Sequence, residues 1–188
     1  AQVTVGTLMS QYYSRNETLC VPVLEISDAE EKPQIGGFCV LFGLQPMGEL
    51  SLREGEQLML LQNNLKRYAF TMQNGTRFLL EQVQTEREIT AAVDEAGNQY
   101  PVLTVTVRGN STVSALSWDA DQEDQRQQGK QELADRLLTF LTTQQKEAGM
   151  DLANSFLLLA GQERNLWEQY REEPAQYLSD LKIRLFVE

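Results

Sequence analysis

The sequence predicts an α+β fold in which helices pack on one face of a mostly antiparallel, twisted sheet. Strand-like segments separated by short turns dominate the middle of the chain, and residues 131–180 carry helical patterns. In residues 181–187, apolar side chains then alternate with mostly polar neighbours, a period of two that is typical of a half-buried strand. Because these apolar side chains need cover, we expect this C-terminal strand to be inserted inside the sheet and not at its edge.

The middle of the chain has the pattern of consecutive hairpins. Asn74-Gly75 is the strongest two-residue hairpin signal in the sequence, and residues 96–98 form a second turn signal. Residues 102–107 are rich in β-branched side chains, which favour strands. The strands predicted here cover residues 68–72, 77–84, 88–93 and 102–107.

In the first part of the chain, the sequence predicts a short helix and a second group of strands. Residues 4–16 have a helical apolar pattern, whereas residues 19–26 and 37–43 are strand-like. Residues 45–48 are predicted to form a turn before a short strand at residues 49–50. Ser51 and Glu54 then have the spacing of a capping box, so we expect a helix to begin there.

The helical region near the C-terminus is divided by glycine and proline. A long helix with an apolar stripe begins near Gln131, and Gly149 interrupts it. Asp151 can cap a second, apolar helix over residues 152–159. A shorter amphipathic segment follows, and Pro174 prevents its continuation.

These patterns also predict the hydrophobic core. Side chains on the apolar sides of the predicted strands and helices are expected to be largely buried. The core residues predicted in this way are Phe38, Val40, Phe42, Leu137, Leu141, Phe156 and Ile183.

Length, composition and charge limit the class of protein. A chain of 188 residues with 41% hydrophobic content can bury a core of its own, and without a Pro- or Ser-rich linker we expect residues 1–188 to form a single domain. A net charge of -11 argues against binding to nucleic acid and to anionic lipid. The chain starts at Ala1 without a signal peptide, so we expect it to be a mature or excised part of a longer protein.

Catalytic, cofactor-binding and metal-binding residues are not predicted. The chain contains no histidine, which excludes Ser-His-Asp and Cys-His nucleophiles and removes the commonest metal ligand. Cys20 and Cys39 lack CxxC spacing, and we expect two buried free thiols in preference to a disulfide. Gly36-Gly37 precedes a predicted strand and does not open a helix, so it is not a phosphate-binding loop.

Acidic residues offer a few candidate sites, each with a simpler structural explanation. Glu86 with Glu88, and Glu172 with Glu173, are possible catalytic carboxylate pairs, but acidic residues in these patterns are usually solvated surface. The segment of Asp94, Glu95 and Asn98 lacks the ligand alternation of a calcium loop, and a hairpin turn explains it.

Trp167 and Tyr170 could form an exposed recognition patch. Aromatic residues at helical spacing beside apolar helices more often cover the core, and we expect that role for both.

The order of these motifs resembles a known family. Residues 36–44 (GGFCVLFGL), residues 47–51 (MGELS) and the Glu-bearing helix after them are similar to a passage in the C subunit of bacterial spore-germination receptors, the Ger(x)C lipoproteins. The long helix that runs up to Asp151, the apolar helix, Trp167 and the last strand resemble the C-terminal end of the same family. The resemblance covers nearly the whole chain, with residues 1–18 as a helical linker that leads into the domain.

The resemblance implies a non-catalytic interaction domain that assembles with the A and B membrane subunits of a nutrient germinant receptor. It also implies a place on the outer surface of the spore inner membrane, with a lipid anchor outside this chain. The alternatives are an extracytoplasmic carboxylate-dependent hydrolase and a small-ligand-binding domain. The absence of histidine disfavours the hydrolase.

Overall fold

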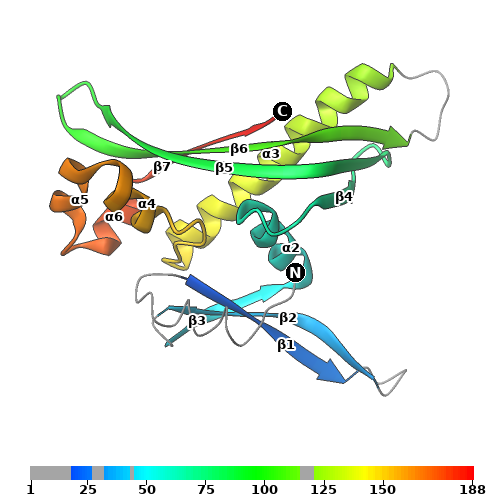
Figure 1. Ribbon diagram of the computed structural model, residues 1–188, viewed down its shortest axis with the longest axis horizontal. Coiled ribbons are helices and arrows are strands. Elements are labelled where there is room, and N and C mark those ends of the chain that lie inside the picture. The colour runs from blue at the N-terminus through cyan, green and yellow to red at the C-terminus, as the bar shows by residue number, and fades with distance from the viewer. Residues whose placement is uncertain (1–17, 27–31, 43–44, 115–120) are drawn as a thin grey trace.

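The described part of the chain forms two β-sheets with helices between and beside them (Figure 1). The computed structural model describes residues 18–26, 32–42, 45–114 and 121–188. A three-stranded antiparallel sheet has the order β1-β2-β3, and a four-stranded sheet has the order β4-β5-β6-β7. The strands are β1 (Thr18–Ile26), β2 (Pro33–Phe42), β3 (Gln45–Ser51), β4 (Arg67–Thr71), β5 (Arg77–Val93), β6 (Gln99–Ser114) and β7 (Lys182–Val187).

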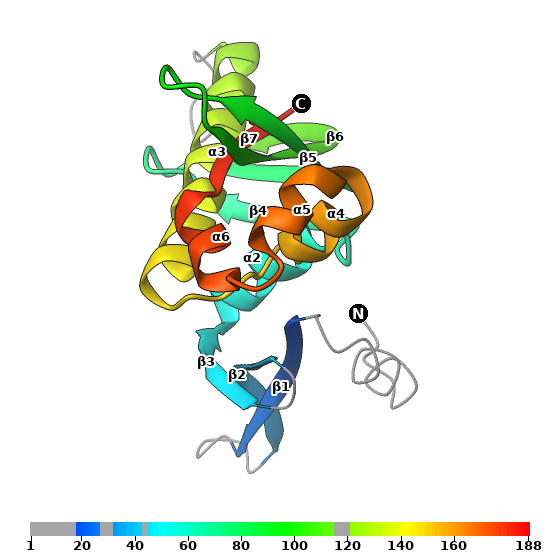
Figure 2. The ribbon, with the colours of Figure 1, turned by 90° about the vertical axis from the view of Figure 1, so that its left-hand side faces the viewer.

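The helices lie on one face of the four-stranded sheet, and the small sheet extends beyond them (Figures 1 and 2). The first, α2, contacts both β2 and β5 and so connects the two sheets. The longest, α3, packs along β6 and β7. The helices are α2 (Leu52–Leu61), α3 (Gln122–Glu147), α4 (Ser155–Gln162), α5 (Arg164–Tyr170) and α6 (Pro174–Asp180).

Strand register shows which residues of the large sheet form the face that the helices cover. Leu103 of β6 is opposite Ile89 of β5 on one side and Ile183 of β7 on the other. Paired residues point to the same face, and alternate residues continue that apolar row along the strands. Leu103, Val105 and Val107 are therefore fully buried under the helices.

The α+β class and the mostly antiparallel pairing confirm the predicted fold class. The C-terminal strand also joins the sheet, but the expectation that it is interior is wrong, because β7 pairs only with β6 and lies at the sheet edge. The β5–β6 hairpin already occupies the other side of β6. The helices after β6 bring the chain back parallel to β6, on the side that remains open.

Several predicted boundaries are also wrong. Residues 77–93 form one continuous strand in place of two, with an irregularity between Glu81 and Gln84 where Gln82 has φ 53°. Residues 45–48 belong to β3 and do not form a turn. The helix before Pro174 ends as predicted, at Tyr170, but Pro174 also begins the further helix α6, which was not predicted. Proline is well tolerated at the first position of a helix.

The strongest local signals are confirmed. The Ser51 side chain accepts a hydrogen bond from the Glu54 amide, and the Glu54 carboxylate accepts one from the Ser51 amide, which completes the capping box of α2. Asn74-Gly75 joins β4 to β5, and Gly75 has φ 84°, a conformation that glycine adopts without strain.

The predicted core is largely confirmed. Phe38, Val40, Leu137 and Leu141 are buried, but Ile183 and Phe156 are only half-buried. Ile183 lies on the edge strand, and Phe156 lines a cavity, so each keeps one open side. A truncation of Phe156 should therefore cost less than the roughly 3–5 kcal/mol expected for a fully buried phenylalanine. The predicted helix over residues 4–16, the predicted linker over residues 1–18 up to Thr18, and the side chain of Phe42 lie outside the described part of the structure.

Gly129 provides a test of how α3 packs on the sheet. A Cβ atom at this position would lie 2.1 Å from the Phe78 ring, which is itself fully buried. We expect Gly129→Ala to lower the free energy of unfolding by roughly 1–3 kcal/mol, because overpacking outweighs the helix propensity of alanine.

The matched control is Gly161→Ala in α4, where an added Cβ meets open space. It should raise the free energy of unfolding by up to about 1 kcal/mol. Urea melts of both variants give the comparison, and a stabilising Gly129→Ala would contradict this packing of α3.

Candidate interaction surface

The candidate carboxylates lie on the exposed surface in two separate places. Glu86 and Glu88 are on the solvent face of β5, where Glu86 pairs with Arg108. Glu172 and Glu173 are exposed between α5 and α6. In the part of the chain that the structure describes, no group of three or more acidic or cysteine side chains is placed to hold a metal ion.

Asp94 and Asn98 form the turn of the β5–β6 hairpin, as predicted. The Asp94 carboxylate accepts hydrogen bonds from the Ala96 and Asn98 amides at 2.9 and 2.8 Å. These bonds, with those from Asn98 foremost, lower the pKa of Asp94. The carboxylate therefore stabilises a turn in which Gly97 has φ 86°.

Trp167 and Tyr170 belong to the cover of the core, as predicted. Tyr170 is buried and donates a hydrogen bond to Asp180 at 2.9 Å. Trp167 is half-buried, with its ring centroid 4.7 Å from that of Phe156. Neither ring forms an exposed patch.

The two cysteines are free thiols, as predicted, although both are only half-buried. In the β1–β2 register, Cys20 is opposite Val40 while Cys39 is opposite Val21, so the two thiols point to opposite faces of the hairpin. Burial, and secondarily the neighbouring Cys39, raises the pKa of Cys20 to about 12, which keeps this thiol protonated at neutral pH.

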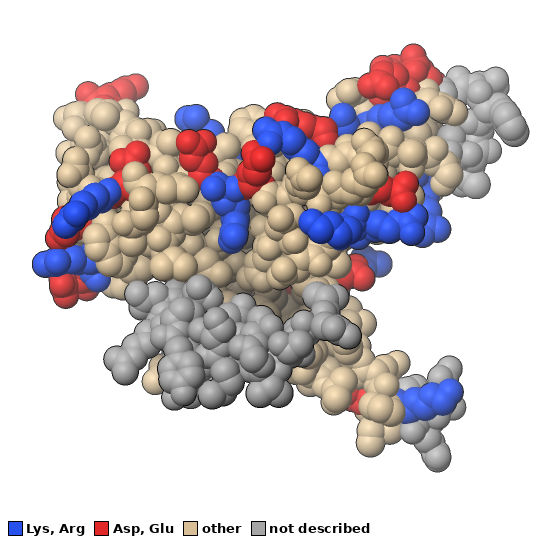
Figure 3. All heavy atoms as spheres, in the orientation of Figure 1, with Lys and Arg blue, Asp and Glu red and all other residues tan. Residues whose placement is uncertain are grey.

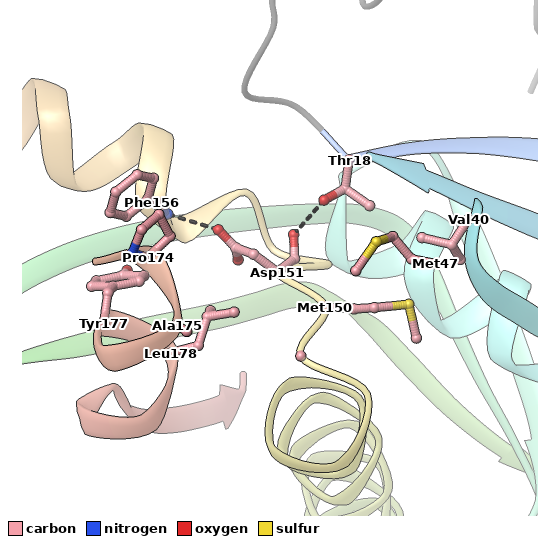
Figure 4. A pocket seen from close by; sticks show the side chains of 11 residues that line it. Thr18, Val40, Met47, Met150, Asp151, Phe156, Pro174, Ala175, Tyr177 and Leu178 are labelled. Atoms are coloured by element: carbon pink, nitrogen blue, oxygen red, sulfur yellow. Dashed lines mark hydrogen bonds between the residues drawn. The ribbon is translucent and has the colours of Figure 1, made fainter. Parts of the chain in front are cut away.

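Residues 149–154, between α3 and α4, tie the small sheet to the rest of the molecule (Figure 4). Thr18 at the start of β1 donates through its hydroxyl to the Asp151 carbonyl and through its amide to the Asn154 side chain, both at 2.9 Å. From β5, Arg87 donates to the Ala153 carbonyl at 2.7 Å. This one segment is thus bonded to strands of both sheets.

The side chain of Asp151 fixes the start of α4. One carboxylate oxygen accepts from the Ser155 amide and hydroxyl at 2.9 and 2.8 Å, and the other accepts from the Phe156 amide at 2.8 Å. Burial raises the pKa of Asp151, while these donors and the nearby Arg87 oppose that shift. As predicted, the Asp151 carboxylate bonds to the first amides of the apolar helix. The predicted boundary is wrong, because the helix begins at Ser155 and its N-cap residue is Asn154 and not Asp151.

The free end of the β1–β2 hairpin carries an exposed apolar surface, which we call the hairpin face. It consists of Leu24, Ile26, Pro33 and Ile35, where Leu24 pairs with Ile35 and Ile26 pairs with Pro33. Leu24 and Ile26 are 68% and 74% exposed. Contiguous apolar surface of this kind is a feature of sites at which proteins bind partners.

The hairpin face is the outer part of a row of apolar side chains, and the inner part of that row packs against the core. Cys20 on β1 and Val40 and Phe38 on β2 face the core, and the same alternation places Leu24 and Ile26 on that side further along the strand. The hairpin extends past the rest of the molecule, so its outer apolar residues have no cover in the described structure (Figure 1). Figure 3 shows uncharged surface where the hairpin leaves the body and a basic group near its outer end, whereas mixed charges cover the rest of the visible face.

The sequence prediction missed the hairpin face. The sequence predicts a strand over residues 19–26, but not that its apolar end is exposed. The available signal was the apolar alternation of Pro22, Leu24 and Ile26, which continues up to a polar segment. Whether such a row is covered depends on residues far away in the sequence.

Comparison with known proteins gives a structural match. No family model matches the chain, and no curated protein matches it in sequence. A solved structure described as "Crystal Structure of the GerBC protein" matches with a TM-score of 0.78 and 12% sequence identity. The match covers 98% of this chain and 59% of that chain. This chain has the GerBC fold. The fold implied by the resemblance in sequence is therefore confirmed, and the GerBC-like fold spans just over half of the protein it matches.

Asp151 provides a test of the segment that joins the two sheets. We expect Asp151→Asn to lower the free energy of unfolding by roughly 1–3 kcal/mol, because the amide nitrogen cannot accept the bond from the Phe156 or Ser155 amide.

The control for this change is Asp121→Asn at the N-cap of α3, where the side chain is exposed and asparagine caps as well as aspartate. Its effect should stay within about 0.5 kcal/mol. Urea melts compare the two, and equal effects would contradict the structural role of the Asp151 carboxylate.

Proposed function

We propose that this chain is a non-catalytic interaction domain of the C subunit of a nutrient germinant receptor, and that it acts by binding other subunits. The observation that supports this proposal is an exposed apolar hairpin face on a domain with the GerBC fold. Residues 1–188 act as a single domain, with residues 1–18 as the linker into it.

The partners in this proposal are the A and B membrane subunits. The chain functions outside the cytoplasm, at the outer surface of the spore inner membrane, and the lipid anchor belongs to a part of the protein outside this chain. Within the described residues, no helix is long and apolar enough to cross a membrane.

Charge favours a protein as the partner of the hairpin face. The sequence between β1 and β2 contains Asp28, Glu30 and Glu31 with a single basic residue, Lys32, and the whole chain has a net charge of -11. An anionic lipid surface would repel these carboxylates. A protein surface with an apolar groove and basic residues beside it would be complementary to both features.

A catalytic role has less support. Glu86 and Glu88, the carboxylates best placed to form a pair, project from the uncovered face of the large sheet, and Glu86 is held by Arg108. General acid chemistry needs a carboxyl in a cleft where its pKa is raised. Their position on an open face favours a surface role over a hydrolase.

The hairpin face provides the test of this function in the full-length protein. We expect the double variant Leu24→Ser/Ile26→Ser to reduce recovery of the A and B subunits from spore membranes, and nutrient germination, by at least about tenfold. The side chains are exposed, so the fold should lose little stability. Co-purification, a germination assay and immunoblots of all three subunits measure the effect.

The control is Val93→Ser/Phe186→Ser, which removes exposed apolar side chains at 60% and 50% exposure from the large sheet. This variant, and Glu86→Gln or Glu88→Gln, should keep germination. A carboxylate variant that loses germination at normal subunit levels would overturn the proposal and restore a chemical role.

A further inference from the structure

The C-terminal strand β7 leaves one edge of the large sheet open, and we call the open side of residues 182–188 the β7 edge. The strand pairs only with β6, contains no proline and pairs without a bulge. At the opposite edge of the sheet, β4 is partly capped, because the Arg136 side chain donates to the Thr71 carbonyl at 3.0 Å. An open sheet edge is a template on which another strand can pair.

Backbone groups point outward along the β7 edge. The Glu188 amide donates to the Val107 carbonyl at 2.9 Å, and the Glu188 carbonyl accepts from the Gly109 amide at 3.3 Å, so both groups of Glu188 point towards β6. Successive residues of a strand point these groups to opposite edges, so every second residue of β7 points them away from β6. The outward-pointing residues are Ile183, Leu185 and Val187. No hydrogen bond to their outward groups is found among the described residues.

The side chains of β7 divide between the two faces of the sheet. The side chains that face the helices are half-buried, and they are Ile183, Leu185 and Val187. The side chains on the opposite face are exposed, and they are Lys182, Arg184 and Phe186. Neither cation of this strand forms an ion pair within the described structure. Both faces of β7 therefore have side chains that a neighbouring strand could cover.

One antiparallel register lets β7 pair with a second β7 across a two-fold axis. In this register Leu185 is opposite Leu185 of the second copy, and Ile183 is opposite Val187. Directly opposite residues point to the same face, so these apolar side chains would cover each other. The same pairs join the outward-pointing residues, so each pair can exchange both of its backbone hydrogen bonds.

The exposed face is complementary in the same register. Arg184 is opposite Phe186, which places a guanidinium beside an aromatic ring. Lys182 is opposite Glu188, and opposite charges across a strand pair are stabilising. A register centred on Arg184 would instead bring two like charges together, which is destabilising. Charge therefore favours the register centred on Leu185.

We propose that the β7 edge binds a second copy of this chain, so that two large sheets join into one continuous sheet. The two-fold axis makes the interface self-complementary, and each contact outside the axis occurs twice. This proposal goes beyond the binding of other subunits. It does not depend on the hairpin face, which belongs to the small sheet.

The size and charge of the chain set the expected strength. One strand from each copy makes a small interface, so we expect weak association of the full chain, with a Kd on the order of 10–100 µM. Two copies with a net charge of -11 repel each other, but salt near 0.15 M largely screens exposed charges that are more than about 8 Å apart. Sedimentation equilibrium at this salt concentration measures the monomer–dimer constant.

Proline substitution tests the backbone pairing. Val187→Pro removes one outward N–H group, and should weaken self-association at least about tenfold, while an edge strand tolerates the proline. The matched control is Ala69→Pro in β4, at the other edge of the same sheet. The Met72 amide donates to the Thr76 carbonyl, so Ala69, three residues earlier, points its N–H group away from β5. This control should leave the dissociation constant unchanged.

Charge reversal tests the register. Lys182→Glu places a carboxylate opposite Glu188, and should weaken self-association about fivefold, since the pair occurs twice. Adding Glu188→Lys restores opposite charges, and should bring the constant back to within about twofold of the original. Both side chains are exposed, and Glu188 contacts only the exposed Arg108, so the fold should tolerate each change.

The proposal is overturned if the chain stays monomeric at several hundred micromolar, or if Val187→Pro and Ala69→Pro change the constant equally. A double charge variant that binds no better than Lys182→Glu alone would overturn the register centred on Leu185. Circular dichroism of each variant shows whether a lost association reflects a lost fold.

Discussion

The contacts of residues 149–154 are the constraint on which the rest of this structure depends. The Asp151 carboxylate starts α4, its carbonyl holds Thr18 of β1, and the Ala153 carbonyl holds Arg87 of β5. Met150, Leu152 and Ala153 are buried in the same core. Because buried backbone carbonyls must have hydrogen-bond partners, these bonds fix where the small sheet is attached. The position of the hairpin face depends on that attachment, since the face extends from the small sheet.

The two proposed surfaces differ in kind. The hairpin face is formed by one local element, and it is exposed because the hairpin is longer than the body it packs on. Changes there should alter binding to partners with little effect on the fold. The β7 edge is formed by backbone groups that point away from β6, so it exists only when the large sheet is assembled. A second copy bound there would stabilise the assembled form, because it binds the folded state alone.

Local rules predicted much of the secondary structure. Ser51 with Glu54 and Asn74-Gly75 were correct because their bonds are made within a few residues. Predictions that depended on distant partners were less successful. The edge position of β7 depends on which side of β6 was already paired, and the half-burial of Ile183 follows from it. The two strands predicted over residues 77–84 and 88–93 are a single strand in the structure, because β6 pairs with both segments.

The sequence by itself determined the α+β class, the capping box and the hairpin turns, and it excluded histidine-dependent chemistry. Each of these follows from composition or from residues close together in the chain. Only the tertiary structure decided that the strands form two sheets, that Leu24 and Ile26 are exposed, and that β7 lies at a sheet edge. Alternation shows which strand residues share a face, but the cover for that face comes from distant parts of the chain. Thr18 and the Asp151 carbonyl, which are hydrogen-bonded across 133 positions, show how far apart such partners can be.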